Sequence, residues 1–192
     1  MLFTKEVLFF KYIPQGYREN EKVLFAGVDF SGIQNFIYQD DNIESLNEIA
    51  GRSEYIQLLT VKINEELKEI LEDYFYTPIT VSSGKIQAIL KNDKNARSLF
   101  ENHLKKVQET VFFENQGKIG IFYGATHVLL QNRGSGGCND AFFALANVIE
   151  RNKYQSYNLY VSDSQYSGQA QYSVHSLLPK KESENSIFPD SI

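Results

Sequence analysis

Residues 23–38 have the sequence VLFAGVDFSGIQNFIY. Residues 23–29 form a short apolar run that ends in an acid, which is typical of a buried strand. Ser31 and Gly32 come next, and we expect a first helix to begin near Ser31. Asp29 therefore lies at the carboxyl end of a buried strand, where its carboxylate can either cap the helix or bind a ligand.

The order of the other segments indicates the fold class. Apolar residues at helical spacing predict a helix that resumes at Ser53, after a polar break at residues 39–47. Further along the chain, we expect two strands to form a hairpin around the turn Ser82–Ser83–Gly84. The loop NDKN at residues 92–95 is expected to cap the second long helix, and a last strand follows that helix. These segments are, in chain order, residues 23–29, 53–74, 77–81, 85–90, 96–107 and 118–123.

This βαββαβ order predicts an α+β, ferredoxin-like domain with two helices on one face of an antiparallel sheet. We expect an extra apolar helix at residues 140–151, behind the loop RGSGG at residues 133–137, which we interpret as a linker. The last 30 residues are polar. The predicted organisation is therefore one domain over residues 1–162, with an N-terminal extension, and a loosely attached tail at 163–192.

Composition and charge exclude several classes of protein. The 192 residues carry a formal net charge of −5, so bulk attraction to nucleic acid or anionic lipid is not expected. A single cysteine, Cys138, excludes an internal disulfide and favours the cytoplasm. The apolar residues 7–10 are too few and too closely flanked by charges for a signal peptide, and the longest apolar run is too short to cross a membrane.

Two sequence motifs resemble those of a known family. The pattern D-x-SGIQ-x-FI is present at residues 29–37, and the sequence IAGRS at 49–53 precedes the long helix. The chain resembles the first, GGDEF-like palm domain of the large polymerase-related subunit of type III CRISPR effector complexes, of the Csm and Cmr kinds. The resemblance covers residues 23–157 and rests mainly on SGIQ and on Arg52–Ser53.

The chain also departs from the family pattern. The family's glycine-rich hairpin is here Ser82–Ser83–Gly84–Lys85, with one glycine, and the chain has neither a His-Asp pair nor Gly-Gly-Asp-Asp. The resemblance therefore implies a degenerate palm that helps to hold ATP opposite an active second palm, which makes cyclic oligoadenylate in antiviral defence. It implies a second palm or other effector subunits as partners, with crRNA and target RNA associated only indirectly.

The chemistry of the residues favours binding over catalysis. Two-metal nucleotidyl transfer needs at least two well-placed carboxylates, and this region offers only Asp29, as a candidate ligand for Mg²⁺. The hairpin instead supplies hydroxyls, backbone amides and the Lys85 ammonium, which can act as a point charge toward phosphate. We assign no catalytic residue. The candidate nucleotide-binding residues are Asp29, Ser31, Gly32, Gln34, Arg52, Ser53, Ser82, Ser83, Gly84 and Lys85.

Two other functions stay open at this point. The chain can be a nucleotidyl cyclase that pairs with itself and takes its second carboxylate from the partner copy. It can also be a structural interaction module, in which Asp29 is a helix cap, Arg52 a surface ion-pair partner and residues 82–84 a simple turn.

Overall fold

The computed structural model describes residues 6–38, 45–132 and 140–162, and it describes side chains within the last range only as far as residue 155. The chain divides into two compact units, residues 1–154 and 155–192. The second unit contributes only helical residues 155–162 to the described part. The predicted linker at 133–137 and the predicted tail at 163–192 lie outside the described residues, so the predicted division at residue 162 stays a prediction.

A five-stranded sheet forms the centre of the first unit, in the spatial order β1-β5-β2-β4-β3. Strands β2 to β5 pair antiparallel with one another, and their order confirms the α+β, ferredoxin-like palm fold. Strand β1 is an addition that pairs parallel with the far end of β5. The strands are β1 (Val7–Phe10), β2 (Lys22–Ser31), β3 (Thr77–Ser82), β4 (Lys85–Lys91) and β5 (Gly120–Asn132).

The helices begin at local capping signals. Ser45 caps α2 by accepting a hydrogen bond from the Glu48 amide, so α2 starts well before the predicted Ser53. Asp93 caps α3, as the NDKN sequence predicted, and its Oδ1 accepts from the amides of Asn95 and Ala96 at 2.6 and 3.3 Å. The helices are α1 (Ile33–Tyr38), α2 (Leu46–Ile70), α3 (Lys94–Glu114) and α4 (Asp140–Ser162), with a short 3-10 turn, η1 (Glu72–Tyr74).

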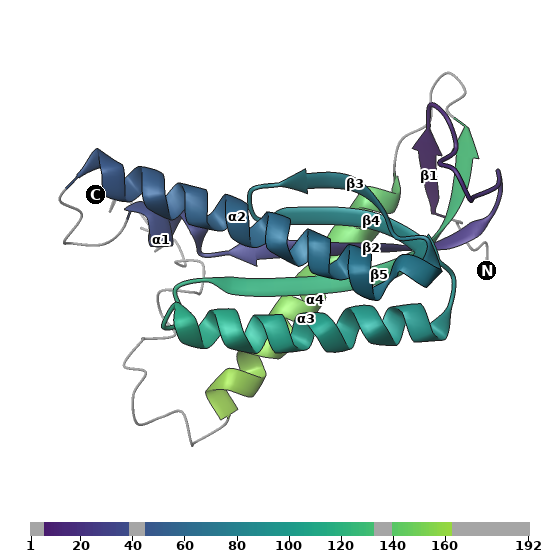
Figure 1. Ribbon diagram of the computed structural model, residues 1–192. Helices are drawn as coiled ribbons and strands as arrows, with labels where there is room; N and C mark the ends of the chain where they lie inside the picture. Colours follow the sequence, from purple (N-terminus) through teal and green to yellow (C-terminus); the bar gives the residue numbers. More distant parts are fainter. Residues whose placement is uncertain (1–5, 39–44, 133–139, 163–192) are drawn as a thin grey trace, which may run out of the picture. The chain divides into compact units, whose positions relative to one another are not determined.

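Helices α2 and α3 cover one face of the sheet, and α4 runs behind it in Figure 1. Alternate residues of β2, including Val28 and Phe30, face α2 and α3. They form the main core with buried side chains from β4, α2, α3 and β5, among them Ile86, Ile63 and Leu104. The residues between them on β2, including Asp29, therefore point to the opposite face.

Two glycines allow α4 to pack closely against this second face. Gly27 of β2 and Gly124 of β5 are directly paired. A Cβ atom on Gly27 would lie 2.9 Å from Leu145, and one on Gly124 would lie 2.8 Å from Val148. The missing side chains leave a trough that the apolar side of α4 fills. The predicted extra helix is thus confirmed, and it packs directly on the sheet.

Candidate functional site

Four residues of neighbouring strands form a row across the α4 face of the sheet. Ser82 of β3 pairs with Lys85 of β4, Lys85 pairs with Asp29 of β2, and Asp29 pairs with Phe122 of β5. Directly paired residues of an antiparallel sheet point to the same face, so their side chains are neighbours. The structure thereby brings together three of the predicted site residues, Ser82, Lys85 and Asp29.

Asp29 is half-buried among charged side chains from two elements. Burial raises the pKa of its carboxyl above the ordinary 3.8, the charges of Lys85 and Lys153 oppose that rise, and the charge of Glu150 adds to it. Lys153 and Glu150 both belong to α4. Lys85 is the partner of Asp29 on β4, and Lys153 lies over Phe122, the partner of Asp29 on β5, so Asp29 has a lysine on each side.

Helix α4 is fixed above this row by two contacts with β5. The Asn152 side-chain amide donates a hydrogen bond of 2.8 Å to the backbone oxygen of Tyr123. The Lys153 Nζ lies 5.7 Å from the ring centroid of Phe122, a cation–π distance. Lys153 was missed in the sequence analysis. Its position, four residues after Ile149 and eight after Leu145, places it on the helix side that faces the sheet, and this spacing could have identified it.

The hairpin turn beside Lys85 is held by a hydrogen bond to α2. Gly84 is buried with a φ of +82°, a conformation that favours glycine. Its amide donates to the Thr60 Oγ1 at 2.8 Å, and its carbonyl oxygen accepts from the Phe30 amide at 2.8 Å. Because the Gly84 amide has an internal acceptor, Gly84 contributes to a site through the turn it forms. Ser82, Ser83 and Lys85 are exposed beside it.

The SGIQ segment forms the tight entry from β2 to α1. Gly32 has a φ of +83°, and a Cβ atom there would collide with the backbone oxygen of Lys118. The Phe36 amide donates to the Gly32 oxygen at 2.9 Å. Ser31 ends β2 opposite Gly120, and Gln34 is exposed on α1. The glycine of the motif is thus required by the backbone, and the Gln34 side chain is accessible from solvent.

Arg52 and Ser53 lie on α2, the helix that covers the opposite face of the sheet from Asp29. The Arg52 guanidinium donates to the Phe36 backbone oxygen at 2.9 Å and to the Glu48 carboxylate at 2.6 Å. It also lies 5.8 Å from the centroid of the Phe36 ring. These contacts tie α1 to α2. The structure therefore does not bring Arg52 or the exposed Ser53 into the Asp29 row.

The described residues contain no group of three or more His, Cys, Asp and Glu side chains arranged to hold a metal ion. Asp29 has one further acid in its surroundings, Glu150. The described residues alone therefore do not complete the ligand shell of a metal ion at Asp29. In the same described part of the chain, no helix combines the length and apolarity required to cross a bilayer.

The structure is similar to solved chains of the Csm1 subunit. Against Csm1 in T. onnurineus the TM-score is 0.60, with 22% sequence identity over 73% of this chain and 21% of that chain. Against the Csm1-Csm4 subcomplex of the type III-A CRISPR-Csm interference complex, the TM-score is 0.58 and the sequence identity is 22%. The match covers 74% of this chain and 20% of that chain. Against a Csm1-Csm4 cassette in complex with one ATP, the TM-score is 0.50 and the sequence identity is 22%. The match covers 72% of this chain and 19% of that chain.

This chain thus spans about a fifth of the length of the solved chains it matches. No functionally curated protein shows significant similarity to it. A family model described as Csm1 subunit domain B matches residues 22–168, which include the Asp29 row and α1 to α4. The match covers well over half of the sequence, so the chain belongs to the Csm1 domain B family, the palm-type domain of type III CRISPR-Csm complexes.

Proposed function

We propose that this chain is a nucleotide-binding palm domain that binds ATP beside the row Ser82–Lys85–Asp29 and catalyses no reaction by itself. The observation that carries this proposal is the row on one face of the sheet in which Asp29 is flanked by Lys85 and by Phe122, with Lys153 over the Phe122 ring. A Csm1-Csm4 cassette with the same fold has been solved in complex with one ATP, which supports the choice of nucleotide.

Each side chain of the row can contribute to nucleotide binding in a distinct way. The ammonium groups of Lys85 and Lys153 attract phosphate as point charges. The Asp29 carboxylate can accept a hydrogen bond from a ribose hydroxyl or contact a Mg²⁺ ion that a triphosphate carries. The hydroxyls of Ser82 and Ser83 can donate to phosphate oxygens. Phe122 is only 3% exposed, so it positions Lys153 and does not stack on a base.

The carboxylates near the row do not form a usual catalytic pair. Two-metal catalysis needs two ions about 3.5–4 Å apart, held by carboxylates from neighbouring strands. Here the residues that flank Asp29 on β4 and β5 are Lys85 and Phe122, and Glu150 comes from α4. We therefore infer that the chain supplies binding surface, while a second palm domain supplies the catalytic carboxylates.

The proposed setting is antiviral defence by a type III effector complex in the cytoplasm. The proposed partners are a second palm domain and other Csm subunits, and the Csm1-Csm4 subcomplex supports the choice of Csm subunits. Guide and target RNA would associate indirectly, since the chain has a net charge of −5. The predicted domain over residues 1–162 would be the unit that enters the complex.

A thermal-unfolding titration with ATP and Mg²⁺ tests the proposal. At about 100 times the dissociation constant, a ligand that binds only the folded state stabilises it by about 2.7 kcal/mol. We expect a rise in Tm for the wild type and a smaller one for Asp29→Ala. The same samples are assayed for ATP consumption: turnover abolished by Asp29→Ala would instead identify the self-pairing cyclase. If the Tm of the wild type does not change with ATP, the chain would instead be a structural interaction module.

A further inference from the structure

Strands β2 and β4 carry three successive pairs of residues on the α4 face of the sheet, and each pair has a different chemistry. From the hairpin end inward, these pairs are Asp29 with Lys85, Gly27 with Gln87, and Phe25 with Ile89. Neighbouring pairs are two residues apart on each strand, which is about 7 Å along the sheet. The surface therefore changes from charged, through a neutral amide, to apolar.

The third, apolar pair is closed by α4. Phe25 and Ile89 are fully buried, and Phe142 of α4 packs edge to face against Phe25 with 5.2 Å between the ring centroids. From there α4 crosses behind the sheet toward β5 in Figure 1. The hairpin end of β3 and β4 is left exposed, as at Ser82 and Lys85. The second pair thus lies between a covered and an open part of the same face.

Gln87 presents an uncommitted amide at this boundary. Its partner on β2 is Gly27, which has no side chain and lies under Leu145 of α4. Its partner on β3 is Thr80, which is half-exposed, as Gln87 itself is. No hydrogen bond among the described residues engages the Gln87 side chain. Its carboxamide is therefore available to a ligand that binds beside Lys85.

A carboxamide offers a hydrogen-bond donor and an acceptor side by side. Adenine presents the matching pair at its N6 amine, which donates, and at its N7, which accepts. Guanine and hypoxanthine carry an oxygen in place of the N6 amine, so they present two acceptors at this edge. An amide cannot pair with both of those groups at once, and it therefore distinguishes adenine from the keto purines.

We propose that Gln87 selects adenine in the nucleotide site, with its side-chain oxygen accepting from the N6 amine and its side-chain nitrogen donating to N7. The inference rests on the proposed binding of ATP beside Asp29, and it gives the nucleotide a direction. The triphosphate lies at Lys85, and the base lies toward the second pair of residues. The spacing between the pairs and the length of the lysine and glutamine side chains leave room for the ribose. Because Gln87 is neutral, it adds no attraction for phosphate.

The test is a calorimetric titration, in the presence of Mg²⁺, with ATP and two analogues. ITP replaces the N6 amine by an oxygen, and 7-deaza-ATP lacks N7. We expect the wild type to bind ATP about tenfold more tightly than either analogue, since each analogue loses one of the two hydrogen bonds. Gln87→Leu should bind all three nucleotides with equal affinity. This variant should still bind inorganic tripolyphosphate like the wild type, which would show that the fold and the phosphate contacts persist.

The matched control makes the same substitution away from the site. Gln57 is exposed on α2, the helix that covers the opposite face of the sheet, and Gln57→Leu should keep the preference for ATP. A preference retained in Gln87→Leu, lost in Gln57→Leu or absent from the wild type would overturn the role of Gln87, while ATP binding itself would stand. A wild type that binds neither ATP nor tripolyphosphate would overturn the proposed function as well.

Discussion

Gly27 and Gly124 lie directly opposite one another on β2 and β5, at the place where α4 comes nearest to the sheet. The next pair on this face, two residues along each strand, is Asp29 and Phe122. Likewise, Lys153 comes one helical turn after Ile149, whose side chain lies against both glycines. The close approach of α4 at the glycine pair therefore determines how near Lys153 lies to Asp29. The fold and the candidate site thus depend on the same contact.

Gly27→Val should destabilise the protein by about 1–3 kcal/mol, because its side chain would overpack against Leu145 and Ile149. Urea denaturation measures this difference. The matched control is Gly51→Ala on α2, where a Cβ atom meets nothing within 4 Å. That change should raise the stability by about 0.5–1 kcal/mol, since alanine favours the helix. A Gly27→Val protein as stable as the wild type would show that α4 does not pack here.

Thr60→Val should cost about 1–3 kcal/mol, since it leaves the buried Gly84 amide without its acceptor. Thr60→Ser keeps the hydroxyl and serves as the control. Because Thr60 connects α2 to the turn beside Lys85, the Val variant should also weaken ATP binding through loss of turn geometry. Equal unfolding free energies for the Val and Ser variants would contradict the role assigned to this hydrogen bond.

The raised pKa of Asp29 predicts how the free energy of unfolding changes with pH. A carboxyl whose pKa is higher in the folded state binds protons more tightly there, so its contribution to stability falls as the pH rises from the unfolded-state value of 3.8 through the folded-state pKa. Asp29→Asn removes this penalty. The variant should be more stable than the wild type at pH 7, and the difference should shrink on acidification below 3.8. Denaturation of both proteins across this range checks the sign, and a less stable Asn variant at pH 7 would contradict it.

Arg52→Ala should loosen α1 without unfolding the domain. The guanidinium holds the Phe36 oxygen and stacks near its ring, so its loss should reduce the hydrogen-exchange protection of residues 33–38. Arg52→Lys keeps the charge but not the forked geometry, and it should restore protection only in part. If both variants protected α1 like the wild type while ATP binding fell, Arg52 would be a ligand and not a structural link.

Local sequence signals predicted the core of the fold because they coincide with its tertiary contacts. The apolar residues 23–28 are buried in β2, and Asp93 caps α3 as its neighbours indicated. Strand β5 was expected only over residues 118–123, yet it extends from Gly120 to Asn132. Gly124 suggests an interruption of the strand, but the packing of α4 requires it there.

The rest depended on contacts that sequence spacing does not encode. Residues 7–10 were expected to be an N-terminal extension; they form β1 because the long β5 offers them an edge. Asp29, Ser82 and Lys85 were predicted as site residues, and the strand register places them side by side. Arg52 was predicted among the nucleotide-binding residues, and the structure places it on α2 with a hydrogen bond to the Phe36 oxygen of α1, apart from the Asp29 row. Thr60 was missed because its partner, Gly84, is distant in the chain, whereas the helical spacing of Lys153 with Leu145 and Ile149 could have identified that residue.

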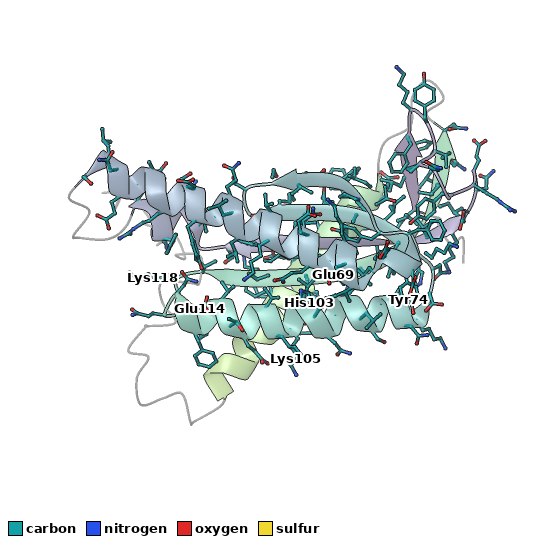
Figure 2. The ribbon with its side chains drawn as sticks, in the orientation of Figure 1. Glu69, Tyr74, His103, Lys105, Glu114 and Lys118 are labelled. Atoms are coloured by element: carbon teal, nitrogen blue, oxygen red, sulfur yellow. The ribbon has the colours of Figure 1, made fainter. Side chains whose placement is uncertain are left out.

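The most direct test of the central claim is calorimetric titration of ATP with Mg²⁺ into three proteins. These are the wild type, Lys85→Gln/Lys153→Gln, and the matched variant Lys105→Gln/Lys106→Gln on the exposed side of α3, where Figure 2 labels Lys105. If the row binds the nucleotide, the first double variant should lose about tenfold or more in affinity, and the second should match the wild type. Equal affinities for the two double variants would show that ATP does not bind beside Asp29.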